Sequence, residues 1–395
     1  MANRANQVSP EIELLLICAR RRLDAAAATR LTELAGSALD WPLLLHLAGE
    51  NGLLPLLRKH LLETAPAAIP PDSLSQLREA ARANALRALF LSAELFRVSD
   101  ALRLRGISAI SYKGPVLAAR AYGNPSLRQF DDLDIVVSQN SMPAVYEIMA
   151  ALAYQARLPR EAFFAKEARA IPGEYVFVHK INGAMVEVHT ESTLRHFPIP
   201  PDLERMFRRS SAVSVDGREV PAFATEDEVI MLSVHGSKDF WARLIWVADV
   251  AELLAQSAGS LDFEGLFAEA KRLKITRMLK LGFSLAREVL NADLPEEAAR
   301  AIENDRAVQR LTAELRDSLL HLGGSSESLF RRSLYRIRMT EALGDGLRYW
   351  ARLSTAPAED DWAMAHLGER SSRFYAFLRP FRLWRKYGPG AARIR

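Results

Sequence analysis

The sequence predicts an α+β fold, in which a mostly helical chain surrounds a small mixed β-sheet and has helical regions at its N-terminal and C-terminal ends. Three observations lead to this prediction. Residues 135–137 form an Ile-Val-Val run that is typical of a buried strand. Two alternating β-rich runs, residues 175–181 and 184–190, flank Asn182-Gly183, a strong local hairpin signal. The long segments on either side of this central part have helical patterns.

The composition indicates a globular chain with a large core. It has 395 residues, of which 49% are hydrophobic, and this predicts two or three domains. Cys18 is the only cysteine, so no disulfide framework forms within one chain, and we expect this thiol to be inert and buried. Neither a signal-peptide pattern nor an apolar run of the ~20 residues that a membrane span needs is found. We therefore expect a soluble cytoplasmic protein.

The N-terminal part reads as a series of helices that support the rest of the chain. Asp40 is placed to cap one helix, and Asn51 to end it. After a proline-containing linker, Asp72 or Ser73 is placed to cap a long helix that ends near Gly106. Nothing in these helices indicates catalysis.

The pattern then changes to alternating strands and helices. A strand is expected over residues 107–113 and a helix over residues 115–122. Lys113, Gly114 and the free N–H groups of this helix start together favour phosphate binding.

Asp132 and Asp134 mark the next strand, which continues over residues 133–137. Side chains alternate along a strand, so the two carboxylates project to the same side. Two neighbouring carboxylates repel each other, and a divalent cation removes that cost. Mg²⁺ prefers one or two carboxylates together with substrate phosphates, so the pattern predicts a magnesium site.

The hairpin predicts a third carboxylate beside this pair. A two-residue turn at Asn182-Gly183 sets a register in which the numbers of facing residues sum to 365, so that Val178 faces Glu187. Glu187, His189 and Glu191 share one face of the second strand. If the hairpin flanks the Asp132 strand, Glu187 completes a set of three carboxylates.

The C-terminal half is expected to begin with one long helix over residues 226–256. Thr225 and Glu228 have the spacing of a capping box at its start. His235, Lys238 and Asp249 then fall in one narrow sector of the helix. This sector either lines a cleft or is a polar face in solvent, and the pattern alone leaves both open.

The motifs in this order resemble those of the DNA-polymerase-β-like nucleotidyltransferase superfamily and, more narrowly, of the bacterial family of uncharacterised nucleotidyltransferases. In that narrower family a Lys-Gly pair stands where better-known relatives carry Gly-Ser. The resemblance covers most of the chain, more weakly before Phe90. It is carried by Lys113-Gly114, Arg128 with Asp132-x-Asp134, Glu187-Val188-His189, His235 through Leu254, and Arg379-Pro380 with Lys386-Tyr387.

The resemblance implies a set of site residues and cofactors. It implies an Mg²⁺-dependent enzyme with an NTP as substrate and two ions as the expected number. The implied catalytic and metal-binding residues are Asp132, Asp134 and Glu187, with Glu187 either a ligand of the second ion or the acceptor of the hydroxyl proton. The implied nucleotide-binding residues are Lys113, Gly114 and Arg128. The substrate-side candidates are His189, His235, Lys238 and Asp249.

The helical and α/β patterns, together with the resemblance, predict four segments. They are an N-terminal helical region, residues 1–105; a nucleotidyltransferase-like α/β core, residues 106–223; a helical substrate-side domain, residues 224–330; and a helical segment with a basic tail, residues 331–395.

The leading functional hypothesis is transfer of a nucleoside monophosphate, with ATP as one possible donor, to a hydroxyl of a small molecule or peptide. The Lys-Gly pair leaves nucleotidyl and phosphoryl transfer both open. The tail at residues 368–395 has eight Lys or Arg and one acid, interleaved with aromatic residues. An RNA-modifying nucleotidyltransferase is therefore an alternative. A nucleotide-binding or partner-docking protein without turnover is a third. The oligomeric state is left open.

Overall fold

The computed structural model describes residues 8–166, 171, 173–190, 197–321 and 329–355. Within these residues the chain forms helices around a single mixed seven-stranded sheet, which confirms the predicted α+β class. The basic tail, the Gly-Ser break at residues 323–326 and Glu191 lie outside the described residues. No helix in the described part of the chain is both long and apolar enough to cross a bilayer.

The strand that carries Asp132 and Asp134 lies in the middle of the sheet. The strand order is β3-β4-β5-β2-β1-β7-β6, so β2 has β5 on one side as a parallel partner and β1 on the other as an antiparallel one. Both predicted central strands are present. The strand bounds are β1 Ala109–Tyr112, β2 Asp132–Val137, β3 Tyr154–Ala156, β4 Glu174–His179, β5 Met185–Thr190, β6 Ser211–Val215 and β7 Arg218–Ala222.

The predicted register of the β4–β5 hairpin is wrong by two residues. Val178 faces Met185 and Val176 faces Glu187, because the strands close at the pair His179 and Ala184 and residues 180–183 form the loop. The His179 side chain explains the longer loop, since its Nδ1 accepts hydrogen bonds from the next two loop N–H groups, of Ile181 and Asn182. A shift of two residues leaves every side chain on its predicted face.

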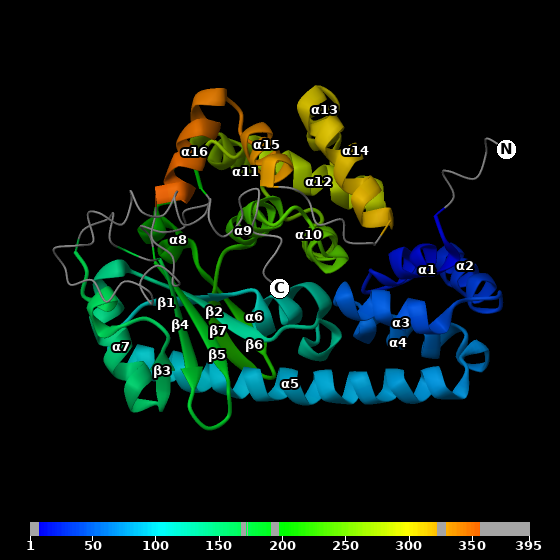
Figure 1. The fold of residues 1–395 in the computed structure, drawn as a ribbon, viewed down its shortest axis with the longest axis horizontal. Coiled ribbons are helices and arrows are strands. Elements are labelled where there is room, and N and C mark those ends of the chain that lie inside the picture. Colours follow the sequence, from blue (N-terminus) through cyan, green and yellow to red (C-terminus); the bar gives the residue numbers. More distant parts are fainter. Residues whose placement is uncertain (1–7, 167–170, 172, 191–196, 322–328, 356–395) are drawn as a thin grey trace, which may run out of the picture.

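The N-terminal helices form one side of the molecule (Figure 1). The predicted cap is confirmed, because the Asp40 side chain accepts a hydrogen bond from the Leu43 N–H, and Asn51 ends this helix. The long helix is also confirmed, but Pro70 rather than Asp72 or Ser73 precedes its first turn. Their bounds are α1 Pro10–Cys18, α2 Ala25–Ala35, α3 Trp41–Glu50, α4 Leu54–Thr64, η1 Pro66–Ala68 and α5 Pro71–Leu104.

The helix α5 runs beneath both the sheet and helices α1–α4 and so joins the two halves of the molecule (Figure 1). Its buried residues Leu91 and Leu95 pack in a core with the strand residues Leu133 and Val186. Short elements connect the strands. They are α6 Gly114–Leu117, the π-helical turn η2 Ala118–Tyr122, η3 Pro125–Leu127, η4 Gln139–Ser141, α7 Met142–Ala151 and η5 Arg160–Phe163.

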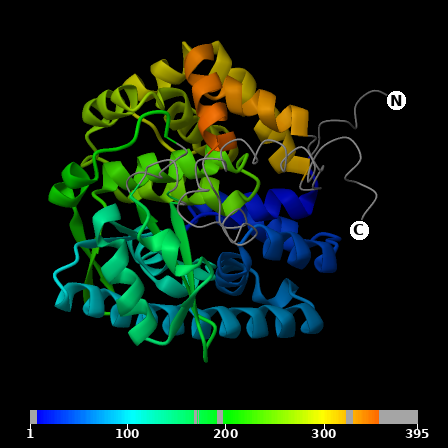
Figure 2. The same ribbon diagram turned by 60° about the vertical axis from the view of Figure 1, so that its left-hand side comes forward.

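The C-terminal helices cover the opposite side of the sheet from α5 (Figures 1 and 2). They share one apolar core with the N-terminal helices, in which Leu15 and Leu57 belong with Leu253 and Leu281. The bounds are α8 Leu203–Arg209, α9 Thr225–Lys238, α10 Leu244–Gln256, α11 Phe263–Arg272, α12 Thr276–Leu290, α13 Glu296–Glu303, α14 Arg306–His321, α15 Leu329–Arg338 and α16 Leu343–Thr355.

The predicted single helix over residues 226–256 is wrong, because the chain breaks between α9 and α10. Phe240 and Trp241 adopt left-handed backbone angles, with φ of 61° and 50°. The Trp241 N–H donates to the Gly236 carbonyl at 2.8 Å, which turns the chain back on α9 and buries the indole completely. Burial of a large aromatic side chain offsets the cost of two left-handed residues.

The predicted capping box at the start of α9 is also wrong. Ala224 occupies the cap position, and no side chain caps the helix. Glu228 is buried instead and forms an ion pair with Arg120 of η2. The helix start is therefore fixed to the sheet side of the molecule by a salt bridge.

We predict that Gly236→Ala destabilises the protein by about 1–3 kcal/mol, the usual cost of overpacking a core. A Cβ at Gly236 would lie 2.6 Å from the Trp241 ring, which is fully buried and has no room to move. Urea unfolding measures the change. The matched control is Gly49→Ala, also in a helix, where the new Cβ would meet only Leu54 at 3.6 Å. Equal stability of the two variants would contradict the proposed packing.

Candidate metal and catalytic site

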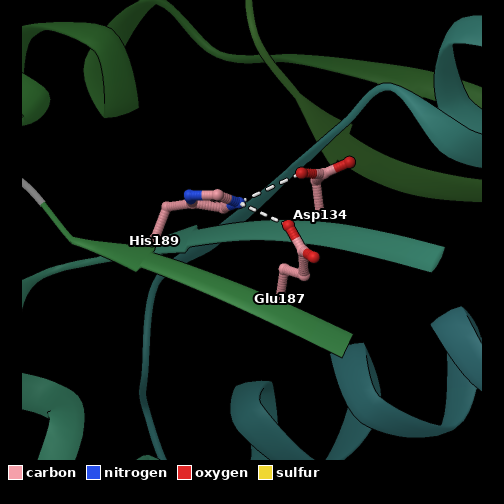
Figure 3. Close-up of side chains that lie close together, drawn as sticks. All are labelled: Asp134, Glu187 and His189. Atoms are coloured by element: carbon pink, nitrogen blue, oxygen red, sulfur yellow. Dashed lines mark hydrogen bonds and ion pairs between the residues drawn. The ribbon is translucent and has the colours of Figure 1, made fainter. Parts of the chain in front are cut away.

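The candidate site lies where β2 and β5 run side by side. These strands pair in parallel with Asp134 opposite Glu187, so the two side chains project from the same face of the sheet. His189 follows two positions later on β5 and shares that face. One ligand atom from each of these three residues lies within 4.8 Å of the other two, and Figure 3 shows the side chains converging.

His189 lies between the two carboxylates. Its Nε2 is 3.0 Å from Asp134 Oδ1 and 3.8 Å from Glu187 Oε2. The ring packs edge-on against Tyr112 of β1, with 5.6 Å between ring centroids and 68° between the ring planes. Tyr112 is itself buried and packs against Phe223. The imidazole thus packs against one aromatic ring, Tyr112, which Phe223 supports in turn.

Asp134 is an ionised carboxylate in the interior. Burial opposes its ionisation, but the charge of Lys113 and the hydrogen bond from His189 outweigh that effect and hold the pKa of Asp134 well below its usual range. The Lys113 Nζ lies 3.4 Å from Asp134 Oδ1. This lysine therefore supplies the positive charge that lets Asp134 stay ionised out of water.

The pKa of Glu187 is shifted in the opposite direction, upward. Burial, together with the charges of Glu174 and Asp134, raises the pKa of Glu187 to about 7. A carboxylate poised near neutral pH is suited to exchange a proton at that pH. The two carboxylates therefore have different protonation behaviour although they face each other.

Asp132 stands beside this cluster but is not one of its three members. It begins β2 opposite Met185, two residues before Asp134, and therefore projects from the same face. Burial and the charge of Asp134 raise the pKa of Asp132. The predicted trio of Asp132, Asp134 and Glu187 is thus on one face, with His189 occupying the position closest to the last two.

Lys113 and Gly114 connect β1 to α6 directly in front of this face. Lys113 has φ of 54°, which is rare for a residue with a side chain, and Gly114 has φ of 42°. A Cβ at Gly114 would lie 3.3 Å from the Asp132 carbonyl oxygen, a tight contact, so glycine lets the start of α6 lie this close to the start of β2. The sharp turn directs Lys113 back over Tyr112, with Nζ 5.1 Å from the ring centroid.

Arg128 and Asp249 are joined to each other in the interior rather than exposed in a cleft. Two guanidinium nitrogens of Arg128, Nε and Nη2, each donate to an Asp249 oxygen at 2.8 Å, and the Tyr122 hydroxyl donates to the same carboxylate at 2.9 Å. Asp249 is completely buried. The pair fixes the segment before β2 to helix α10, so Arg128 is placed to position the Asp132 strand.

His235 and Lys238 lie in the last turn of α9. Both are within 4 Å of Asp239, and the His235 ring packs against Trp246 at 5.0 Å between centroids. The expected common sector with Asp249 does not form, because the chain breaks after α9. These two residues are partly exposed and are not members of the Asp134 cluster.

Sequence reasoning missed two residues of the site, Glu174 and Tyr112. Glu174 faces His189 across the hairpin and raises the pKa of Glu187. In the predicted register, in which the numbers of facing residues sum to 365, Glu174 would face Glu191 rather than His189; the face was therefore predictable, but the correct partner required the correct loop length. Tyr112 precedes Lys113 in a short strand, and only the pairing of Tyr112 with Asp134 reveals its place beside the cluster.

The donor set fits a divalent cation. Two carboxylate oxygens and an imidazole nitrogen are common protein ligands, and the net charge of the two carboxylates favours a doubly charged ion. Burial raises the pKa of both Asp132 and Glu187, and the neighbouring carboxylates add to the effect, so a cation on this face would offset the lost solvation as well as the repulsion.

The residues of the site lie within a span of the chain that matches a known protein family. A family model described as an uncharacterised nucleotidyltransferase matches residues 37–291. This span includes both strands of the site and helices α3 to α12. No curated protein matches the chain.

We predict that Arg128→Ala destabilises the protein by about 3–5 kcal/mol, because it leaves Asp249 as an uncompensated buried charge. The double variant Arg128→Met/Asp249→Leu removes both charges and should be more stable than Arg128→Ala. Chemical unfolding measures both. Arg30→Ala, which removes an exposed pair with Glu13, is the control and should change stability much less. A double variant less stable than Arg128→Ala would contradict this account of the pair.

Proposed function

Because the chain belongs to the family of uncharacterised nucleotidyltransferases, we propose that it transfers a nucleoside monophosphate from an NTP, with ATP as one candidate, to a hydroxyl group and releases pyrophosphate. One observation carries the proposal beyond the family. Asp134 and Glu187 face each other on parallel strands, with His189 between them and Lys113 at 3.4 Å from Asp134.

We assign the ion-binding role to Asp132 and Asp134, with Glu187 either a ligand of the second ion or the acceptor of the hydroxyl proton. Mg²⁺, with two ions as the expected number, would supply charge stabilisation to the attacking and leaving oxygens of an in-line displacement. The ionised state of Asp134 is secured by Lys113 and His189, so this carboxylate is available as a ligand without first losing a proton.

Glu187 is suited to accept the proton of the attacking hydroxyl. In the transfer, the acceptor oxygen forms a bond to the α-phosphorus, and the bond from that phosphorus to the bridging oxygen breaks. The leaving pyrophosphate takes the bonding electron pair, and the hydroxyl proton passes to Glu187. A pKa of about 7 places this carboxylate close to the value that is most effective for a general base at neutral pH.

Lys113 and Gly114 are suited to hold the triphosphate. The lysine ammonium is a mobile charge on a long stem and can stabilise the negative charge that develops on pyrophosphate. Gly114 lets the backbone at the start of α6 lie close to the start of β2, because a side chain at this position would meet the Asp132 carbonyl. Arg128 and Asp249 act indirectly, by fixing the position of β2.

The burial of the site supports a small acceptor. Asp134 is 3% exposed and His189 9%, whereas the Glu187 side chain is 22% exposed, so the site is reached on the Glu187 side. A hydroxyl on a small molecule or on a peptide side chain can approach such a partly buried group more readily than a folded RNA can. His235 and Lys238, which are partly exposed, are our candidates for contact with this acceptor.

We predict that the protein releases pyrophosphate from at least one NTP in the presence of Mg²⁺ and a hydroxyl acceptor or cell extract. Asp134→Asn and Glu187→Gln should each lower the rate by about 10²-fold or more, because each removes a group that acts on the reacting atoms. Glu219→Gln, an exposed strand glutamate on β7, is the matched control and should keep the wild-type rate. Removal of divalent ions with a chelator should stop the release.

The products separate the competing reactions. Release of pyrophosphate supports nucleotidyl transfer, whereas formation of nucleoside diphosphate without pyrophosphate would replace it with phosphoryl transfer. Nucleotide binding with no turnover of any of the four NTPs, across small-molecule, peptide and RNA acceptors, would contradict the proposal.

A further inference from the structure

We infer that His189 is a direct ligand of the divalent ion at this site, and that the site therefore prefers a first-row transition ion over Mg²⁺. This inference names the metal class of the proposed reaction centre and so rests on the proposed function for its biological meaning. The binding itself is tested without nucleotide and does not depend on turnover.

The ligand atoms already have the separations that a bound ion requires. Metal–ligand bonds are about 2.0–2.2 Å long, so two ligands at right angles are about 3 Å apart and wider angles give longer separations. His189 Nε2 lies 3.0 Å from Asp134 Oδ1 and 3.8 Å from Glu187 Oε2. A hydrogen bond accounts for the first distance alone. The convergence of all three atoms within 4.8 Å is the arrangement of a ligand set.

The imidazole is fixed in place before an ion arrives. His189 is 9% exposed and packs edge-on against Tyr112, which in turn packs against Phe223. Its strand is paired on both sides, with Val136 of β2 and with Glu174 of β4 opposite His189. A ligand that does not need to be ordered on binding keeps more of its interaction energy as affinity.

The imidazole nitrogen of His189 is the third donor atom, and it determines which class of ion the site prefers. Mg²⁺ requires near-octahedral oxygen ligands and gives up its water reluctantly, so an imidazole nitrogen is a poor ligand for it. First-row transition ions accept imidazole readily, with affinity that rises from Mn²⁺ through Co²⁺. Asp132, the remaining carboxylate on this face, is outside the cluster of three. In the resting protein the closest set of donors is therefore one nitrogen and two oxygens.

Lys113 competes with any cation for Asp134. Its Nζ lies 3.4 Å from Asp134 Oδ1, so an ion must share or displace that contact when it binds. Because this repulsion acts alike on every doubly charged ion, the difference between ions comes from the imidazole. Replacement of His189 should therefore weaken a transition ion far more than Mg²⁺.

The experiment is pulsed EPR of Mn²⁺ bound to tag-free, full-length protein without nucleotide. We expect ¹⁴N modulation from a coordinated imidazole in the wild type. When only histidine is labelled with ¹⁵N, the ¹⁴N modulation should be replaced by the ¹⁵N pattern. This change identifies histidine as the source of the coordinated nitrogen without any mutation. In His189→Ala the modulation should disappear, whereas His46→Ala, which removes an exposed histidine of α3, should retain it.

Calorimetry on the same proteins gives the affinities. Mn²⁺ affinity should fall by at least about 10–100-fold in His189→Ala, because this loss is already typical when a residue that only hydrogen-bonds to a metal ligand is removed. Mg²⁺ affinity should fall less. Mn²⁺ that binds without histidine modulation in the wild type, or binds no more tightly than Mg²⁺, would overturn the inference, as would the absence of binding. Failure of the transferase assay alone would leave these results unchanged.

Discussion

The collection of carboxylates on one face of the sheet is the constraint on which the rest of this structure depends. Asp134 repels both Asp132 and Glu187, Glu174 also repels Glu187, and burial strengthens these repulsions. The protein limits this cost in two ways. Lys113 and His189 stabilise the charge of Asp134, and Glu187 keeps its proton up to about neutral pH. Such a face is expensive for folding, which is why it indicates a function.

The helices around the sheet fix the strands that carry these groups. Arg128 and Asp249 join the start of β2 to α10 through two hydrogen bonds of 2.8 Å. On the other side, Glu94 of α5 accepts a hydrogen bond from the Asn182 side chain in the hairpin loop and one from Tyr154 of β3. The facing of Asp134 and Glu187 therefore depends on contacts from elements far apart in the chain.

Local patterns in the sequence predicted the parts that local interactions determine. Residue periodicity and turn chemistry were enough to predict the paired aspartates, the β-rich hairpin and the Asp40 cap. The carboxylate face was also predicted, although the hairpin register was wrong by two residues, because a two-residue shift keeps each side chain on the same face. The break after α9 was missed, because helical periodicity does not indicate that the chain turns back so that Trp241 packs on Gly236. The burial of Asp249 was missed for the same reason: its partner Arg128 is distant in sequence.

The Lys-Gly pair shows how one residue can serve both folding and the proposed chemistry. Lys113 turns at φ of 54° and is followed by Gly114 at 42°, so the chain reverses sharply in front of β2. This turn is what places the ammonium against Asp134 rather than in solvent. A serine at this position would offer a hydroxyl but no charge, and Asp134 would lose its counter-ion whenever the metal was absent. On the proposed function, a bound cation would take over the stabilisation of Asp134, and the Lys113 ammonium would then be available to the charge of the triphosphate.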